Sequence, residues 1–254
     1  MAETIAAEPE HVVFETADEL VAQVVARFVT SVSAAIAEKG RAAVALTAGS
    51  IMEQVWATLA ASAADLDWAS VDVFWGDERF VPSDSPDRND VPAEKLLFAA
   101  APFSAARRFS MPSAGGEFGE DLDAAARGYA ETLQTHRRPS DTGEVPTFDV
   151  VLLGVGPDGH CCSLFPDHPS ARDLSATVIP VRESPKPPPL RLSLSFEGLN
   201  TAAEIWPVVS GSGKADAVAA ALGGADREHV PSAGARGRVK TLWMLDAEAA
   251  AGLT

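Results

Sequence analysis

The stretch FDVVLLGVGPDGHCCSLFPDHPS, residues 148–170, decides how this chain is interpreted. Apart from Asp149, its first seven residues are apolar, which predicts a strand buried on both faces, as in a parallel sheet. A glycine-rich loop follows in which residues 154–159 fit G-x-G-x-x-G, and two cysteines and two histidines come next. Four sites are compatible with that composition: a dinucleotide cradle, a metal site, a cysteine nucleophile, or a histidine base.

Helical and strand-like patterns alternate on both sides of this stretch. Thr16 and Glu19 form a capping box before a helical pattern that stops at Gly40. Further strands are expected over 42–46, 71–75, 177–181, 190–196, 204–210 and 241–245, and further helices over 51–62, 91–100, 119–138, 213–222 and 246–253. Over 190–196 the leucines and Phe196 alternate with Arg191 and two serines, which places them on opposite faces of a strand.

This alternation predicts an α/β fold with a mostly parallel sheet flanked by helices. Because no linker with a shift in composition interrupts it, we expect a single domain over residues 1–254. Ligands of such folds bind at the carboxyl ends of the strands. The informative loops are therefore 47–50, 76–90, 154–170 and 210–214.

Composition and charge exclude several classes of protein. The net charge of -16 would repel a polyanion, so we expect no nucleic acid partner. The acidic N-terminus lacks the apolar core of a signal peptide, and no apolar run approaches about 18 residues, so no membrane-spanning helix is expected. The two cysteines are sequence neighbours and give no disulfide framework. We predict a cytoplasmic protein, with a monomer as the default oligomeric state.

The loop after the buried strand fits some of the four sites better than others. A dinucleotide cradle is disfavoured because Asp158 would put a carboxylate beside the phosphates, and Pro166 and Pro169 leave little room for a helix. A metal site is disfavoured because Cys161 and Cys162 diverge and lack a C-x-x-C partner. A cysteine nucleophile stays open, although a histidine nearby in sequence does not make a catalytic pair.

The fourth interpretation concerns Asp158, Gly159 and His160. A flexible loop leaving a buried strand can present a general base together with the carboxylate that orients it. A single histidine in a loop usually only contacts solvent. Whether this one belongs to a site therefore depends on the residues at the ends of the other strands.

Each of those strand ends offers a group suited to an anion. Gly49 and Ser50 lie where a strand turns into a helix, and free N–H groups and a hydroxyl at that point form an anion seat. Arg79 follows the next strand, Lys214 begins a helix after another, and Arg191 lies on the polar face of its own strand. In a chain with a net charge of -16, these features predict a phosphate-binding pocket.

In these motifs the chain resembles the 6-phosphogluconolactonase family, within the wider group of glucosamine-6-phosphate deaminases and ribose-5-phosphate isomerases. The resemblance covers nearly the whole chain and rests on WGDERFVP (75–82), GVGPDGHCCSLFP (154–166), PPPLRLSLSFEGL (187–199), SGSGKADAV (210–218) and TLWMLDAEAA (241–250). It implies a modified Rossmann-like sheet that binds no nucleotide. It also implies hydrolysis of the δ-lactone of 6-phosphogluconate, in the oxidative pentose phosphate route, without metal or cofactor.

The resemblance also suggests roles for residues. We expect His160 to deprotonate water, Asp158 to support the imidazole, and an amide near Gly49 or Arg79 to meet the oxyanion. Ser50, Arg191 and Lys214 are expected to bind the 6-phosphate. The chain departs from the family at TAGSIM (47–52), where Ala48, Ile51 and Met52 replace the usual residues, and at Arg88-Asn89, where serine often precedes the asparagine. Arg88 adds a cation that either helps to hold phosphate or faces solvent, and Asn89 is a candidate binding residue.

Two alternatives remain. A deaminase would carry a glutamate where this chain has Phe165 and a tyrosine where it has Arg79, so both positions favour the lactonase. A sugar-phosphate sensor of the same fold would need a helix-turn-helix segment before it, and only about a dozen residues precede the first helix. A non-catalytic binder of sugar phosphates is compatible with the sequence.

Overall fold

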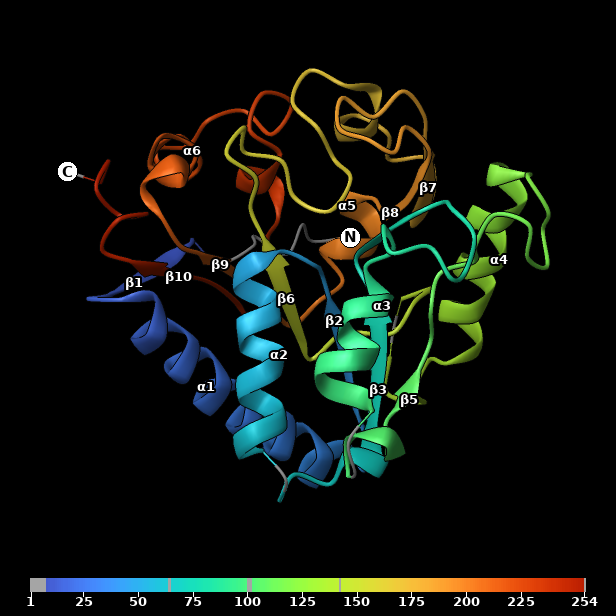
Figure 1. The fold of residues 1–254 in the computed structure, drawn as a ribbon, viewed down its shortest axis with the longest axis horizontal. Coiled ribbons are helices and arrows are strands. Elements are labelled where there is room, and N and C mark those ends of the chain that lie inside the picture. The colour runs from blue at the N-terminus through green and yellow to red at the C-terminus, as the bar shows by residue number, and fades with distance from the viewer. Residues whose placement is uncertain (1–7, 64, 100–101, 142, 254) are drawn as a thin grey trace.

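Seven parallel strands form the central sheet of the computed structural model, which describes residues 8–63, 65–99, 102–141 and 143–253. Their order across the sheet is β1-β10-β9-β6-β2-β3-β5 (Figure 1). The strands are β1 (Glu10–Phe14), β2 (Ala42–Leu46), β3 (Val71–Trp75), β5 (Arg107–Arg108), β6 (Val150–Gly154), β9 (Glu204–Val209) and β10 (Lys240–Asp246). The prediction of an α/β fold with a mostly parallel sheet is confirmed.

The apolar run over residues 150–154 lies at the middle of this sheet. In β6, Val150 pairs with Val44 of β2 on one side and with Glu204 of β9 on the other. Residues 150–153 are fully buried, because helices or loops cover both faces of the central strands. All parallel strands end at one rim, so the segments that follow β2, β6 and β9 meet there (Figure 1).

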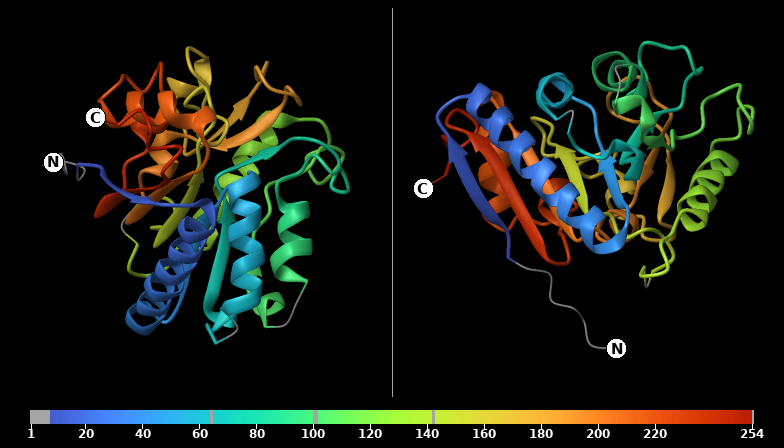
Figure 2. Two further views of the ribbon diagram at one scale, coloured as in Figure 1. Left: turned by 60° about the vertical axis from the view of Figure 1, so that its left-hand side comes forward. Right: turned by 90° about the horizontal axis from the view of Figure 1, so that it is seen from below.

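The helices are α1 (Ala17–Lys39), α2 (Ser50–Ser62), α3 (Asp90–Ala93), α4 (Leu122–Thr135), α5 (Phe196–Leu199) and α6 (Ala215–Leu222). Helix α1 begins at the expected capping box, where the N–H of Glu19 donates to the Thr16 hydroxyl over 3.2 Å, and it ends at Gly40 with φ 77°. Helices α1, α2 and α3 lie on one face of the sheet, whereas α4 lies beyond β5 (Figures 1 and 2).

Helix α1 differs from expectation in one respect. It is long and apolar enough to cross a membrane by length and composition, although no such helix was expected. Its apolar residues recur every three or four positions, and Leu20, Val24, Phe28 and Val32 are buried in the core. Packing on the sheet therefore accounts for its composition.

A second sheet of three antiparallel strands lies beside the first. It comprises β4 (Asp77–Arg79), β8 (Arg191–Leu194) and β7 (Val178–Val181), in the order β4-β8-β7. Gly76 joins the two sheets: its N–H donates to the Leu46 carbonyl, and its own carbonyl accepts from Leu194 N–H. The strand expected over 190–196 is β8 at Arg191–Leu194, whereas Phe196 already begins α5. Both faces of β8 are buried, including Arg191 and Ser193.

Three strands, β1, β4 and β5, and the short helix α5 were not predicted. The final helix expected over 246–253 was wrong, since that segment forms turns. The Asp246 carboxylate accepts the N–H groups of both Ala249 and Gly211, which holds the chain in a turn against β9.

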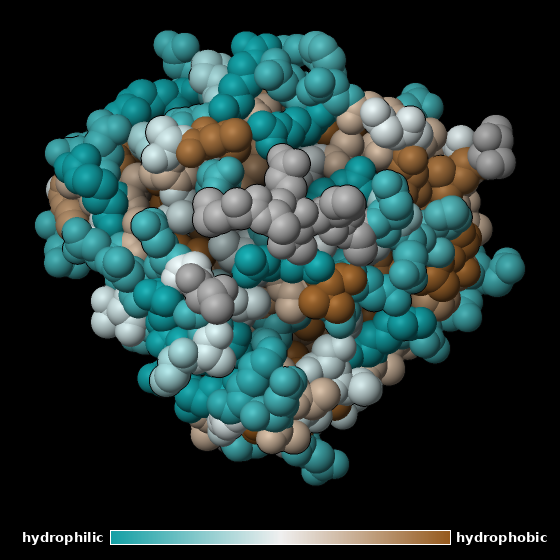
Figure 3. Space-filling model, turned by 180° about the vertical axis from the view of Figure 1, so that it is seen from behind, coloured by the Kyte–Doolittle hydropathy of each residue, from teal (hydrophilic) through white to brown (hydrophobic). Residues whose placement is uncertain are grey.

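The face opposite to that of Figure 1 is mostly hydrophilic, with its apolar residues in small separate groups (Figure 3).

Candidate active site

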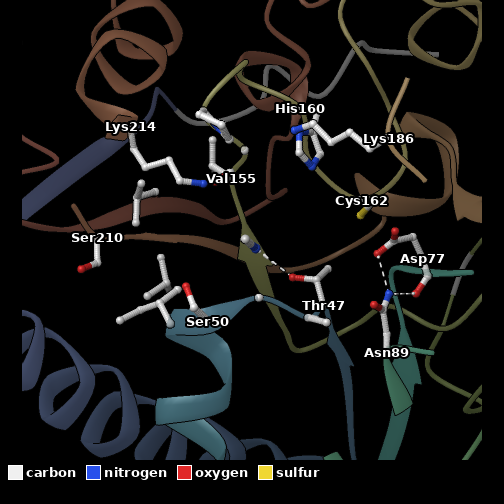
Figure 4. A pocket seen from close by; sticks show the side chains of 18 of the residues that line it. Thr47, Ser50, Asp77, Asn89, Val155, His160, Cys162, Lys186, Ser210 and Lys214 are labelled. Carbon is white, nitrogen blue, oxygen red and sulfur yellow. Dashed lines mark hydrogen bonds between the residues drawn. The ribbon is translucent and has the colours of Figure 1, made fainter. Parts of the chain in front are cut away.

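A pocket of about 280 Å³ opens at the carboxyl ends of β2, β6 and β9 and is closed on one side by the small sheet (Figure 4). All four loops that the sequence singled out contribute to it. Its lining includes Gly49, Ser50, Asp77, Arg79, Asn89, His160, Cys162, Lys186, Arg191, Ser210 and Lys214. The structure thus brings together every predicted site residue except Asp158, which lies directly behind His160.

His160 and Asp158 form a hydrogen-bonded pair in the loop after β6. The distance from His160 Nδ1 to Asp158 Oδ1 is 2.5 Å. Because an ionised carboxylate only accepts, Nδ1 carries the proton and Nε2 keeps its lone pair. Burial disfavours ionisation of Asp158, but the hydrogen bond from His160 and the ammonium of Lys186 outweigh it and hold the pKa of Asp158 well below its usual range. This tautomer is the one a general base requires.

Lys186 is a third member of this cluster. Its Nζ lies 3.0 Å from Asp158 Oδ1 and 2.9 Å from His160 Nδ1 (Figure 4). Lys186 was not among the predicted site residues. The signal available was a cation flanked by prolines, which fix the backbone and so direct the side chain.

The glycines of the G-x-G-x-x-G pattern make room for this cluster. A Cβ at Gly156 would lie 1.9 Å from His160 Nδ1, so no side chain fits there. Gly159 has φ 82°, in the left-handed region that favours glycine. No helix opens from these residues, since 161–168 form turns. The pattern therefore serves the histidine turn, and the dinucleotide interpretation fails.

Two of the predicted cations line the pocket and have N–H groups without a protein partner among the described residues. Lys214 Nζ donates to the Val155 carbonyl over 2.5 Å, and burial followed by the charge of Lys186 lowers the pKa of Lys214. Arg79 donates through Nη1 to the Asp87 carbonyl, and its buried Nε has no partner among the described residues. Both side chains therefore keep N–H groups for an anionic ligand.

Arg191 is more constrained than the other cations. It is 4% exposed, and its Nε and Nη2 donate to the carbonyls of Pro188, Lys186 and Pro187 over 2.9–3.2 Å. Nη1 lies 3.5 Å from the Ser163 hydroxyl. Arg191 therefore braces the segment that carries Lys186, and only Nη1 has capacity for a ligand. Its role in phosphate binding stays a prediction.

The turn at the start of α2, where an anion seat was predicted, borders the pocket. Gly49 is the N-cap residue with φ 147°, and Ser50 opens a helix of 13 residues at the pocket. The Thr47 hydroxyl donates to the Leu152 carbonyl and accepts from Gly154 N–H, which ties this turn to the end of β6 (Figure 4). Of the unusual residues, Met52 is fully buried and Ile51 packs against the core, so they anchor the helix.

The expectations for Arg88 were wrong in both forms. It neither lines the pocket nor faces solvent: it is 3% exposed and forms a bidentate pair with Asp90 at 2.9 Å. Arg88 also lies 3.6 Å from the carboxylate of Glu78, which is fully buried. The sequence did not predict this pairing, because a glutamate in a polar segment is normally expected at the surface. Asn89, by contrast, does line the pocket, and its Nδ2 donates to the Asp77 carbonyl over 2.9 Å.

The two cysteines lie in the pocket wall and behind it. Both are free and buried, and burial raises the pKa of each thiol, so the nucleophilic thiolate is disfavoured.

Phe165 is fully buried with its ring 5.0 Å from that of His160, so the imidazole of His160 packs against an apolar side chain. Within residues 8–63, 65–99, 102–141 and 143–253, no three His, Cys, Asp or Glu side chains are grouped to hold a metal ion.

Comparison with known proteins points in one direction. Residues 15–243 match the family described as glucosamine-6-phosphate isomerases/6-phosphogluconolactonase. The chain is 44% identical over 247 residues to the 6-phosphogluconolactonase of Streptomyces coelicolor, covering 96% of this chain and 95% of that protein. It is also 44% identical over 241 residues to that of Mycobacterium tuberculosis, with 95% and 97% covered.

Solved structures agree with the sequence matches. The structure of 6-phosphogluconolactonase from Trypanosoma brucei is 28% identical, with a TM-score of 0.82 over 97% of this chain and 99% of that one. A monomeric glucosamine-6-phosphate deaminase has a TM-score of 0.71 at 22% identity, covering 96% and 99%, which is a likeness of fold alone.

Proposed function

The chain belongs to the family of glucosamine-6-phosphate isomerases and 6-phosphogluconolactonases, and from that membership we propose that it hydrolyses the δ-lactone of 6-phosphogluconate, a reaction of the pentose phosphate pathway. The relatives that match over nearly the full chain at 44% identity carry this name. The observation that carries the proposal is the His160–Asp158 pair facing a pocket with four cations. We place the reaction in the cytoplasm.

The first step is addition of water to the lactone carbonyl. His160 Nε2 takes a proton from the water as its oxygen bonds to C1, and the imidazolium that forms is stabilised by Asp158. The charge that develops on the carbonyl oxygen is met by an N–H near Gly49 or by Arg79. The bond from C1 to the ring oxygen then breaks, and the departing oxygen takes the proton from the imidazolium. The acid produced ionises and releases a proton to solution.

Binding of the phosphate positions C1 for this attack. The N-terminus of α2 with Ser50, the ammonium of Lys214 and Nη1 of Arg191 offer charge-assisted contacts to phosphate oxygens. Fixing one end of the substrate makes the attack effectively intramolecular. A lactone ester is already reactive, so one base and one oxyanion contact suffice.

The test is proton release from freshly made 6-phosphogluconolactone, compared with its spontaneous hydrolysis. Acceleration by the protein, together with no release of ammonia from glucosamine-6-phosphate, supports the proposal. Binding of 6-phosphogluconate without acceleration would identify a non-catalytic binder, and ammonia release would identify a deaminase. Since Phe165 and Arg79 stand where a deaminase would carry a glutamate and a tyrosine, we expect lactone hydrolysis alone.

A further inference from the structure

One carboxylate in the pocket has no part in the mechanism above. Asp77, the first residue of β4, lines the pocket yet is 5% exposed. Its Oδ2 accepts the Ser163 hydroxyl at 2.7 Å, and its Oδ1 lies 3.4 Å from Asn89 Nδ2. The first contact is strong and the second is long, so Oδ1 keeps acceptor capacity while the carboxylate is held in place.

Asn89 presents a second acceptor beside it. Its Nδ2 must face the Asp77 carbonyl at 2.9 Å, because that oxygen can only accept, and this fixes the amide orientation. The amide oxygen of Asn89 therefore points away from the Asp77 carbonyl, and no donor among the described residues bonds to it. In Figure 4 this oxygen and Asp77 Oδ1 lie on the same side, toward the pocket interior. Two acceptors thus stand side by side in a pocket whose other charged side chains are cations.

The charges around these acceptors restrict what they bind. Arg79, Lys186, Arg191 and Lys214 supply the positive charge of the pocket. A fixed carboxylate among them repels a phosphate or an oxyanion, and it gains most from a hydroxyl donor, since O–H to carboxylate bonds are among the stronger neutral-to-charged contacts. At neutral pH the donors of a phosphorylated sugar lactone are its ring hydroxyls, which are neighbours on the ring.

We propose that Asp77 and Asn89 form a subsite that accepts hydrogen bonds from adjacent ring hydroxyls of the substrate and so determines specificity for polyhydroxylated lactones. The inference rests on the proposed lactonase function and adds the substrate feature that is recognised. A site with committed buried acceptors rejects analogues that lack the matching hydroxyl, because the acceptor is then left unpaired. The N-terminus of α2 and Lys214, on the opposite side of the pocket, are left for the phosphate.

The experiment measures kcat/KM for the phosphorylated lactone and for its 2-deoxy, 3-deoxy and 4-deoxy analogues, with the wild type and with Asp77→Asn and Asn89→Ala. For the wild type, at least one analogue should lose about 10- to 150-fold. For Asp77→Asn, the parent substrate should lose a similar factor and that analogue should lose little more. Asp72→Asn is the matched control, since Asp72 is a buried carboxylate of β3 held by Arg41 and Arg107.

An equal loss on all four substrates with both variants would overturn the proposal and would assign Asp77 to the chemistry or to the fold. Should a variant not fold, the other variant gives the same comparison. If the wild type fails to hydrolyse the parent lactone, the proposed function fails. Calorimetric binding of 6-phosphogluconate and its deoxy analogues still tests hydroxyl recognition in that case, and a wild type that does not distinguish them would overturn it.

Discussion

Two polar clusters face the same pocket but are built in opposite ways. The cluster of Asp158, His160 and Lys186 is part-exposed and lies on loops, and its members bond mainly to one another. The cluster around β4 is buried: Glu78 is fully enclosed and accepts the backbone N–H groups of Arg79, Asn89 and Asp90 at 2.7–3.1 Å.

The difference separates two tasks. Groups that gain and lose a proton during turnover need water and room to respond, which the exposed loop provides. Groups that fix the shape of the pocket need bonds to the backbone, which the β4 cluster provides through Glu78. Changes in the first cluster should therefore alter turnover, whereas changes in the second should alter binding and stability.

The largest effect is expected at the exposed cluster. His160→Asn keeps a polar side chain but cannot take a proton, so kcat should fall about 10²- to 10⁴-fold with little change in KM. Asp158→Asn, which only removes the support for the imidazolium, should lose less. Steady-state kinetics on the phosphorylated lactone measures both, and near wild-type turnover in His160→Asn would place the base elsewhere.

A smaller effect, on binding, is expected at Lys214. Because the half-buried ammonium of Lys214 keeps N–H groups beyond the one that bonds the Val155 carbonyl, Lys214→Met should raise KM for the phosphorylated lactone about 10- to 150-fold and leave plain gluconolactone nearly unaffected. Arg191→Ala is the comparison: it removes the brace under 186–188, so it should harm both substrates. Equal losses on both substrates for Lys214→Met would contradict its assignment to phosphate.

Glu78 allows a test of the buried cluster through pH. Burial raises the pKa of Glu78 to about 7, against the opposing effects of Arg88 and the backbone N–H groups. The folded protein thus binds this proton more tightly than the unfolded chain does. The stability it contributes is present below the unfolded pKa of about 4.5 and is lost as the pH rises through about 7.

Glu78→Gln cannot ionise and should lack this loss. The free energy of unfolding of the variant, relative to that of the wild type, should therefore rise between about pH 5 and pH 8, as measured by urea unfolding at a series of pH values. Asp72→Asn should show no such trend between pH 5 and pH 8: burial raises the pKa of Asp72, but its arginine partners outweigh burial and lower it, so its contribution is lost only as the pH falls below the unfolded pKa of about 3.8. A pH-independent difference for Glu78→Gln would mean that Glu78 stays ionised throughout.

The smallest effect is expected for the cysteines. With their thiols buried and kept protonated, Cys161→Ala and Cys162→Ala should change kcat less than about threefold and should cost only modest stability as small buried apolar groups. A fall of about 10³-fold in a folded variant would instead revive the cysteine nucleophile. Thermal unfolding of each variant is the control.

The sequence predicted what local pattern determines. The buried strand β6, helix α2 with Ser50 at its start, and the His160 loop all follow from periodicity and glycine placement within a few residues. Strand β4 was missed because Asp77, Glu78 and Arg79 read as a polar loop. Their burial depends on pairing with β8, more than a hundred residues later, which no local pattern records.

The errors at Arg88 and in the last segment have the same origin. Arg88 is enclosed because it pairs with the buried Glu78 and donates to the Met111 carbonyl, and residues 246–253 turn because Asp246 accepts the N–H group of Gly211. In each case a polar side chain meets a distant backbone or side chain. The place of Lys186 beside His160 could not be predicted either, because it depends on Arg191 of β8, which bonds to the Lys186 carbonyl and so positions the segment before the strand.

The lack of room for a Cβ at Gly156 has a consequence for laboratory evolution of this protein. Any side chain there would overlap the imidazole, and Gly159 is closed both by its φ of 82° and by Val230, which lies 2.8 Å from where a Cβ would be. A library that randomises the whole 154–160 loop would consist almost entirely of variants with a displaced base. Diversity is better placed at Asn89 and Ser210, which line the pocket without carrying the histidine.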